Sequence, residues 1–511
     1  MARNTRNTWT LPPRGAGPLT KGALYLVLLL ALGAGTLVAH DRLTDVACAP
    51  GVEERDGECT GVTDGGYTFG ELTDVSARIK RENDRVTGDD APYVTVAMMI
   101  PMTSGENAPR RRAATERQIQ HEVQGAYLAQ RAANRSARPA IRLVLANPGV
   151  GSAHWRPVAR QLKEMAEDGK HRLRAVVGFD LSERNTGEAI RHMTGKLGIP
   201  VVGGPISADS LTTPGFSRVV PSNRDQAAVL TRDRDMRDAF LVEDVRPGDS
   251  YVRTLREAFE AKRSAGALES EQYTSTRRGD DDRTLAGDFQ NIVQNICQSG
   301  SDTVFFAGRP PQLRLLVEKL GDQPCENTGN TFRIITGSGA STVDSYVPKD
   351  RTDEWRKALK RVTVEYASVA HPDAWKTSDA PEARSARKEL AALRVAASKL
   401  KGASLTDSRL MTTYDAARTA ITSIRLQSDN GRRTPRLDEV WDGWRRLKNV
   451  DKVPGVSGWI CLDNTGSAHN KAVHVVRLNP EWEQGQSKIT LVRVAWPDGK
   501  PSPSTCTAPS R

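Results

Sequence analysis

The feature that most constrains this chain is an alternation of apolar runs of strand length with segments of helical periodicity. The first run, residues 93–100, is apolar at nearly every position, as in a strand buried on both faces of a sheet. Strands and helices that alternate in this way need crossover connections, and they predict a parallel sheet. The expected series is strand 93–100, helix 115–134, strand 141–146, helix 155–168, strand 173–178, helix 183–197 and strand 199–203.

The same alternation starts again further along the chain. At 511 residues the chain is too long for one compact lobe, and its 38% apolar content is sufficient for a large core. We therefore expect an α/β fold of two lobes, each a parallel sheet flanked by helices. The second series is strand 239–243, helices 249–263 and 284–298, strand 303–306, helix 311–320 and strand 332–336, then strand 362–366, helices 383–402 and 408–427, and short strands within 457–494.

Residues 22–39 form an uncharged apolar segment that follows a basic tail, residues 1–21. About 18 apolar residues lie between the length of a long signal-peptide core and that of a short transmembrane helix. The basic flank keeps the tail in the cytoplasm, so the chain from residue 40 onward is expected outside. We interpret the segment as an uncleaved, single-pass anchor in the cell membrane, with the large domain extracytoplasmic. Cleavage near Ala39, which gives a secreted protein, is the alternative.

Six cysteines are present, and none forms a Cys-x-x-Cys pair, so their spacing does not indicate a zinc site. An even number in an exported chain is typical of disulfides; six free thiols are the alternative. The first pair would close a turn-rich loop within a juxtamembrane segment, residues 40–90. Closeness in sequence favours the pairs Cys48–Cys59, Cys297–Cys325 and Cys461–Cys506.

Charge and motifs exclude several function classes. The formal net charge is +11, but arginines alternate with acids, as in residues 232–235, and aromatics make up only 5%. A basic stripe with stacking rings is absent, so we expect no nucleic-acid partner. The chain also has no GxxxxGK[ST] phosphate loop, no GxGxxG after a strand, no HExxH and no GxSxG, and its eight histidines are dispersed. We therefore expect no enzymatic activity, no cofactor and no metal site.

Three polar loops follow predicted strands, at residues 101–105, 178–182 and 203–210. Open α/β sheets bind ligands at the carboxyl ends of their strands. Backbone N–H groups and hydroxyls at helix N-termini there favour an anionic group such as a carboxylate. Ordinary helix capping by Ser182 and Ser210 is the alternative interpretation.

Seven segments resemble, in order, the motifs of one family. They are VTVAMMIPMTSG, EVQGAYLAQRAAN, RAVVGFDLSERNTGEAI, GIPVVGGPISADSLT, FSRVVPSNRDQAAVL, SDTVFFAG and TTYDAARTAI. On these segments the chain resembles the type I periplasmic-binding proteins, in the branch of branched-chain amino acid receptors of ABC transporters. The resemblance covers about residues 92–480.

The resemblance implies two lobes joined by crossovers, with a ligand in the cleft between them. Asp209 stands where the family has a threonine, and a carboxylate there repels the carboxylate of an amino acid. The implied lobes are 91–218 with 338–430 and 219–337 with 431–511, and the implied hinge strands lie near 217–221, 336–340 and 428–432. The implied ligand-binding residues are Ser182, Ser207, Ala208, Asp209, Tyr251 and Gly337.

The expected function follows from the resemblance and the apolar segment together. It is an extracytoplasmic solute-binding protein for an amino-acid-like small molecule, acting as the substrate-binding component of an ABC-type transporter. Its expected partners are the small-molecule ligand, the membrane through the N-terminal helix, and ABC permease subunits. The alternative is a membrane-anchored sensor or interaction domain that uses the same fold with an altered pocket.

Overall fold

The computed structural model describes residues 47–506, apart from 90, 106–108, 136–137, 233, 235, 264–269, 276–284, 323–324, 326–330, 430 and 484–486. The predicted cytoplasmic tail, residues 1–21, and the predicted anchor, residues 22–39, lie outside the described residues. Within the described ranges, no helix combines the length and the apolar character that a membrane crossing requires.

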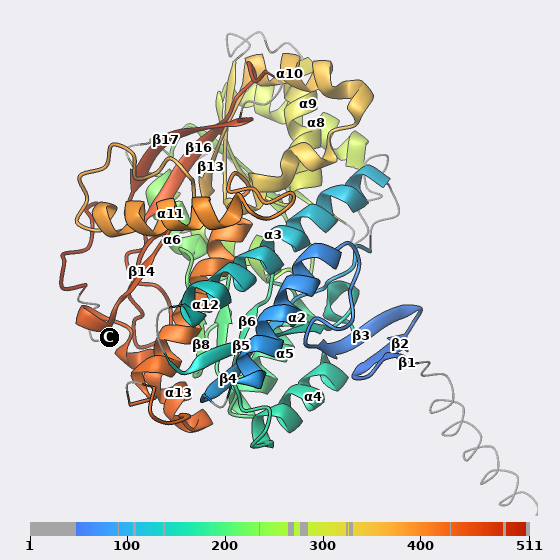
Figure 1. Cartoon of the computed structure of the whole chain (residues 1–511). Coiled ribbons are helices and arrows are strands. Elements are labelled where there is room, and N and C mark those ends of the chain that lie inside the picture. Colours follow the sequence, from blue (N-terminus) through green and yellow to red (C-terminus); the bar gives the residue numbers. More distant parts are fainter. Residues whose placement is uncertain are drawn as a thin grey trace, which may run out of the picture.

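The described chain forms two lobes, each a sheet with helices on both faces (Figure 1). The sheet of the first lobe has the order β1-β2-β3-β5-β4-β6-β7-β8. From β5 to β8 all neighbours are parallel, whereas β1, β2 and β3 add an antiparallel edge. Its strands are β1 Ala47–Ala49, β2 Val52–Arg55, β3 Glu58–Thr63, β4 Tyr93–Met99, β5 Ala140–Asn147, β6 Leu173–Gly178, β7 Val201–Gly203 and β8 Phe216–Arg218.

The sheet of the second lobe has the order β10-β9-β11-β12-β13-β16-β17. It is parallel from β10 to β13, and β16 and β17 complete it as antiparallel strands. Its strands are β9 Ala239–Asp244, β10 Ser270–Tyr273, β11 Thr303–Ala307, β12 Phe332–Thr336, β13 Val362–Ser368, β16 Val473–Leu478 and β17 Ile489–Ala495. A separate hairpin consists of β14 Val453–Gly455 and β15 Gly458–Ile460.

Helices cover both faces of each sheet because apolar positions recur at three- and four-residue spacing, as for buried Trp355, Ala358 and Leu359 of α10. The first lobe holds α2 Thr73–Gly88, η1 Val150–Ser152, α3 Pro109–Asn134, α4 Trp155–Glu167, α5 Arg184–Gly195, α11 Ala383–Ala397, α12 Arg409–Leu426, α13 Leu437–Gly443, η5 Trp444–Arg446 and η6 Asn449–Asp451. The second lobe holds α6 Asn223–Leu230, α7 Ser250–Glu260, α8 Leu285–Ser299, α9 Pro310–Asp322, η3 Ser338–Tyr346, η4 Lys349–Arg351 and α10 Thr352–Arg361. The two-lobed α/β prediction is confirmed.

Helices α3 and α12 pack against each other at very short range in the first lobe. The close approach depends on Gly125, because a Cβ atom at that position would lie 2.4 Å from the carbonyl oxygen of Leu410. The glycine therefore lets the two helix backbones touch. This contact brings the start of α12 to the side of α3 that faces the second lobe.

The chain passes between the lobes in three segments, residues 219–222, 369–382 and 461–472. The first and third run side by side, since Arg218 and Ser467 form a parallel bridge. The first agrees with the hinge expected near 217–221.

The other two expected hinges, near 336–340 and 428–432, are wrong. Strand β13 extends the second sheet beside β12, although it lies within the stretch 338–430 that was assigned to the first lobe. The chain therefore leaves the second lobe only after Ser368. The physical reason is that β12, α10 and β13 form one ordinary parallel crossover unit, which keeps β13 in the second sheet.

All three predicted disulfides are present, and their Cα–Cα separations are 6.1, 5.2 and 6.1 Å in chain order. Separations of this size are normal for disulfides. Cys48–Cys59 ties β1 to β3 at the edge of the first sheet, and Cys297–Cys325 links α8 to the segment after α9. Cys461–Cys506 fixes the last described residue to the segment after β15.

Candidate functional site

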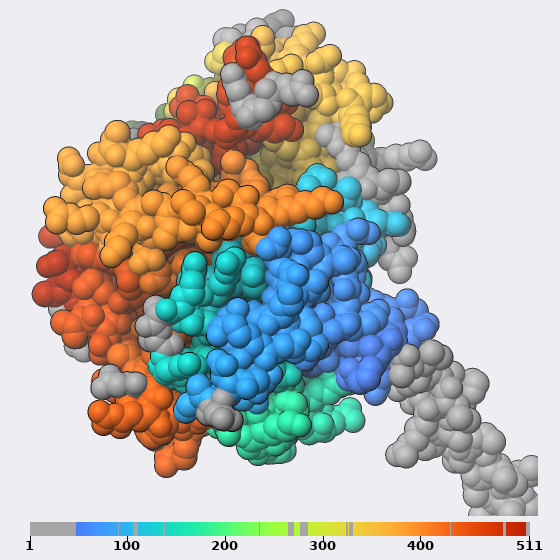
Figure 2. Space-filling view, viewed as in Figure 1, coloured from blue at the N-terminus to red at the C-terminus, as the bar shows by residue number. Residues whose placement is uncertain are grey.

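A cavity of about 270 Å³ lies between the two lobes, and both lobes supply its walls. The first lobe contributes side chains from α3, from the loops after β6 and β7, and from the start of α12. The second lobe contributes the first turn of α7, the segment 309–312 after β11, and η3 after β12. The strand loops meet here because the carboxyl ends of both parallel sheets face each other. On the outer surface, α11 and its neighbours, in orange, lie between the blue helices of the first lobe and the second lobe (Figure 2).

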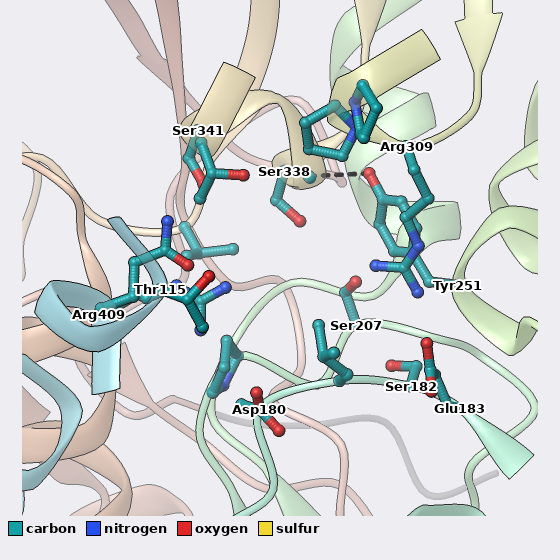
Figure 3. A pocket seen from close by; sticks show the side chains of 18 of the residues that line it. Thr115, Asp180, Ser182, Glu183, Ser207, Tyr251, Arg309, Ser338, Ser341 and Arg409 are labelled. Carbon is teal, nitrogen blue, oxygen red and sulfur yellow. Dashed lines mark hydrogen bonds between the residues drawn. The ribbon is translucent and has the colours of Figure 1, made fainter. Parts of the chain in front are cut away.

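Three of the predicted ligand-binding residues line this cavity. Ser182 follows β6, Ser207 follows β7, and Tyr251 stands in the first turn of α7. Figure 3 shows Ser182 and Ser207 on the loops of the first lobe, with Tyr251 of the second lobe nearby. Their contact with a ligand stays a prediction.

The other three predicted residues do not line the cavity. Ala208 is fully buried in the core of the first lobe. The Oδ2 atom of Asp209 accepts a hydrogen bond of 3.0 Å from the backbone N–H of Arg224. Gly337 lies behind Tyr251, since a Cβ there would be 2.7 Å from the Tyr251 hydroxyl. Asp209 is thus directed to a helix N-terminus, which removes the expected repulsion of a ligand carboxylate.

The wall from the second lobe is organised around Asp249. Its two carboxylate oxygens accept hydrogen bonds of 2.7 and 2.8 Å from Nε and Nη2 of Arg309, and Arg246 forms a further ion pair with it. Burial alone would raise the pKa of Asp249, but the charges of Arg309 and Arg246 outweigh it and hold the pKa at about 2. Asp249 therefore stays ionised and fixes both guanidinium groups at the cavity.

Tyr251 and η3 form the neighbouring part of the same wall. The Arg309 guanidinium lies 4.7 Å from the centre of the Tyr251 ring, a cation–π contact. The Tyr251 hydroxyl accepts a 2.8 Å hydrogen bond from the backbone N–H of Gly339. Burial raises the pKa of Tyr251 to about 12, so the phenol stays neutral. The Ser338 side chain points into the space beside it (Figure 3).

The wall from the first lobe carries a second charged cluster. Arg409, at the start of α12, forms an ion pair with the buried Glu122 of α3. Asp180, in the loop after β6, lines the cavity next to them. Burial raises the pKa of Glu122 to about 7 against the opposing charge of Arg409, and burial likewise raises the pKa of Asp180. Arg409 therefore forms an ion pair with one carboxylate, Glu122, and lies within electrostatic range of a second, Asp180.

The lobes touch at the floor of the cavity. The backbone N–H of Ser250 donates a 3.0 Å hydrogen bond to the carbonyl oxygen of Ser182, and Glu183 and Asp249 form an antiparallel bridge. These contacts hold the loop after β6 against the start of α7. The two lobes are therefore drawn together around the cavity in this structure.

Sequence reasoning missed the charged residues of the site: Asp180, Glu183, Arg246, Arg309 and Arg409. A signal was available for Asp180 and Arg309, because both follow strands of parallel sheets, where ligand loops are expected. In the part of the chain that the structure describes, no group of three or more His, Cys, Asp or Glu side chains is placed to hold a metal ion.

No protein-family model matches the chain, and no curated protein matches it in sequence. Solved structures do match. A leucine-binding protein, LivK, from Thermotoga maritima is 18% identical, with a TM-score of 0.56 over 79% of this chain and 99% of that one. The substrate-binding protein LivJ of a branched-chain amino acid transporter from Streptococcus pneumoniae, in complex with isoleucine, is 15% identical, with a TM-score of 0.56 over 79% and 99%.

A third match has a different ligand. A solute-binding protein of an ABC transporter from R. palustris, in complex with 4-hydroxybenzoate, is 16% identical, with a TM-score of 0.53 over 81% of this chain and 98% of that one. Likeness at this level of identity shows the fold. The chain has the two-lobed fold of type I periplasmic-binding proteins, as the sequence motifs indicated.

Proposed function

We propose that the chain is an extracytoplasmic solute-binding protein, not an enzyme, which captures an amino-acid-like small molecule as the substrate-binding component of an ABC-type transporter. The observation that carries the proposal is the cavity between the lobes, which neither lobe could form alone. Sites of this kind enclose small ligands between pre-formed walls that carry a few placed polar groups. The similar solved structures include proteins in complex with isoleucine and with 4-hydroxybenzoate.

Capture requires that the solute favour the closed arrangement over an open one. A ligand shifts such a balance only by its difference in affinity for the two states. A solute that touches Ser207 of the first lobe and Tyr251 of the second gains its full set of contacts only when the lobes meet. The Ser250–Ser182 hydrogen bond then forms part of the closed state.

The disulfides support the proposed location. Three of them are distributed over both lobes and the final segment. Disulfides persist in oxidising compartments outside the cytoplasm, in agreement with export directed by residues 22–39. On this proposal the anchor segment holds the binding domain at the outer face of the membrane, next to the permease subunits.

The test is a thermal-unfolding screen of the purified protein against amino acids, aromatic acids, peptides and sugars. A solute that binds only the folded state raises the melting temperature. At a concentration one hundred times its Kd, it increases the free energy of unfolding by about 2.7 kcal/mol. X-ray scattering with and without the bound solute then measures closure. A screen in which no solute raises the melting temperature refutes solute capture. A radius of gyration that is the same with saturating solute indicates a rigid module and favours the sensor or interaction domain.

A further inference from the structure

A second cavity, of about 330 Å³, shares no lining residue with the cavity between the lobes. Its walls come from the loop that leads into β8, from α13 and η5, and from the third crossover segment. Helix α13 lies at the end of the first lobe that is remote from the second lobe (Figure 1). The volume is at the lower end of the range of about 300–1,000 Å³ for small-molecule sites. The lining residues are 212–216, Trp441, Trp444, Arg445 and 463–466.

Two tryptophans give this cavity an aromatic wall, and the backbone holds both in place. The Trp444 indole is 3% exposed, and its N–H donates a 3.0 Å hydrogen bond to the carbonyl oxygen of Gly215. Trp441 packs on the same glycine, since a Cβ atom there would lie 2.1 Å from the Trp441 Nε1 atom. Gly215 also has a φ of 81°, which favours glycine. The half-buried Trp441 ring is therefore positioned at the cavity before any ligand binds.

The third crossover segment supplies a wall with unused polar atoms. The Asp463 Oδ1 atom accepts hydrogen bonds of 2.8 and 3.0 Å from the backbone N–H groups of Thr465 and Ser467. It also accepts a 2.6 Å bond from the Thr465 hydroxyl, whereas Oδ2 accepts none within the described ranges. The Asn464 side-chain oxygen accepts a 3.1 Å bond from Lys448, and its amide N–H groups donate to no described residue. The segment therefore offers a carboxylate acceptor and an amide donor to a ligand.

Arg445 adds a charged donor to the same cavity. Its guanidinium lies 5.9 Å from the centre of the Trp441 ring, and it forms no ion pair with a carboxylate of the described chain. The hydroxyl groups of Thr212 and Thr213, from the loop before β8, complete the polar lining. An aromatic surface thus stands beside donors and acceptors, with one positive and one negative charge.

This combination of groups selects among ligand classes. An apolar guest would take water from the Asp463 carboxylate without replacing its hydrogen bonds, which is costly. A pyranose sugar has C–H groups on its ring face, which the electron-rich face of an indole attracts, and hydroxyl groups around its edge, which donate and accept. Two neighbouring hydroxyls also suit the forked geometry of a carboxylate or a guanidinium.

We propose that this cavity is a carbohydrate site, in which a neutral pyranose ring stacks on Trp441 and forms hydrogen bonds with Asp463 and Arg445. The site is separate from the cavity between the lobes and adds a second ligand class to the proposed function. It does not depend on solute capture. The chain would then contact a sugar through its first lobe alone.

The test is saturation-transfer NMR on the full-length protein, with affinities taken from titrations. The probes are the methyl glycosides of glucose, galactose, mannose and N-acetylglucosamine. Cyclohexylmethanol has the ring without the hydroxyl edge, and sorbitol has the hydroxyls without the ring. We expect at least one glycoside to bind, with the strongest transfer to C–H protons of one ring face. Cyclohexylmethanol and sorbitol should bind at least about tenfold more weakly, because each lacks half of the interactions.

Three variants assign the binding to this cavity. Trp441→Ala should weaken the best glycoside about fivefold or more, and Trp441→Phe, which keeps a ring, should lose less. Asp463→Asn keeps Oδ1, which holds the segment, and should weaken binding more than about tenfold, because a hydrogen bond to a charged group is lost. The matched control is Asp442→Asn, which removes an exposed carboxylate of α13 outside the lining and should leave the affinity unchanged. Thermal unfolding without sugar checks that each variant is folded.

Several outcomes would overturn the carbohydrate site. They are no binding of any of the four glycosides, equal binding of cyclohexylmethanol or sorbitol, and glycoside binding that survives both Trp441→Ala and Asp463→Asn. The thermal screen for the proposed function includes sugars, and the variants separate the two cavities. A sugar whose stabilisation is lost in Asp463→Asn but kept in Ser207→Ala binds at the second cavity and is no evidence for solute capture. The reverse pattern supports solute capture and refutes the carbohydrate site.

Discussion

The contact at Gly125 predicts how the substitution Gly125→Ala changes the stability of the protein and its binding of solute. In the substitution Gly125→Ala, the new Cβ would lie 2.4 Å from the Leu410 carbonyl oxygen and 3.0 Å from the Tyr414 backbone nitrogen, whereas ordinary contacts of this kind lie at 3.4–4 Å. Both neighbours are backbone atoms, so no side chain can rotate away. Helices α3 and α12 must therefore separate by about 1 Å, and overpacking of this kind costs about 1–3 kcal/mol.

A second glycine supplies the control. Alanine stabilises a helix interior by about 1 kcal/mol relative to glycine, and this gain offsets part of the cost at Gly125. Gly287 of α8 is exposed, and a Cβ there would meet nothing within 4 Å. Because Gly287 lies in the first turn of α8, Gly287→Ala should show at most this helix-propensity gain and no overlap cost. The difference between the two variants isolates the backbone overlap, and we expect it to be about 1–3 kcal/mol.

The assay is urea unfolding of the wild type and both variants, followed by far-UV circular dichroism. We expect a lower midpoint for Gly125→Ala and an equal or higher midpoint for Gly287→Ala. Because α3 carries Glu122 and α12 begins at Arg409, the Gly125 variant should also bind solute more weakly. Equal midpoints for the two variants would refute the argument that Gly125 sets the helix spacing.

Three further substitutions test other parts of the structure. Asp249→Asn should destabilise the protein by about 3–5 kcal/mol at pH 7, because two guanidinium groups lose their buried partner. Since the pKa of Asp249 is held at about 2, this difference should persist above about pH 4 and shrink as the pH falls toward 2 in urea-unfolding series; a constant difference contradicts it. Ser207→Ala should weaken solute binding more than about tenfold in calorimetry, whereas lower stability with unchanged affinity would show that Ser207 only caps a turn. Replacing both Cys297 and Cys325 by serine should lower stability by about 2–4 kcal/mol, and addition of reductant should then have a smaller effect than on the wild type.

The central strands were predictable from sequence because their burial is continuous. The expected strand 173–178 coincides with β6, and the expected strand 93–100 differs from β4 by one residue. Strands β2 and β3 were missed. They lie near the sheet edge, where exposed polar residues are mixed with buried ones, and the sequence of this segment is typical of turns. Only the Cys48–Cys59 pair indicated that this segment had a fixed structure.

The candidate site was predictable only in part, because several of its residues lie far apart in the sequence. Ser182 and Ser207 follow strands, so the rule for parallel sheets found them. Arg409 and Glu122 are 287 residues apart in sequence, and only the packing of α12 on α3 brings them together. Asp209 also follows a strand, but its carboxylate is directed to the backbone of α6, which no sequence pattern indicated.

The order in which the chain builds its second sheet has a consequence for its synthesis. Strand β13 pairs with β16, but the chain between them returns to the first lobe and forms α11, α12 and the β14–β15 hairpin. While the protein emerges from its N-terminal end, β13 therefore presents an open edge until β16 and β17 arrive. Open edges template pairing between chains, so this interval is the period in which newly made molecules are most prone to aggregate. A chain that stalls before β16 would be left with that edge exposed, and the nascent second lobe is where a chaperone has most to protect.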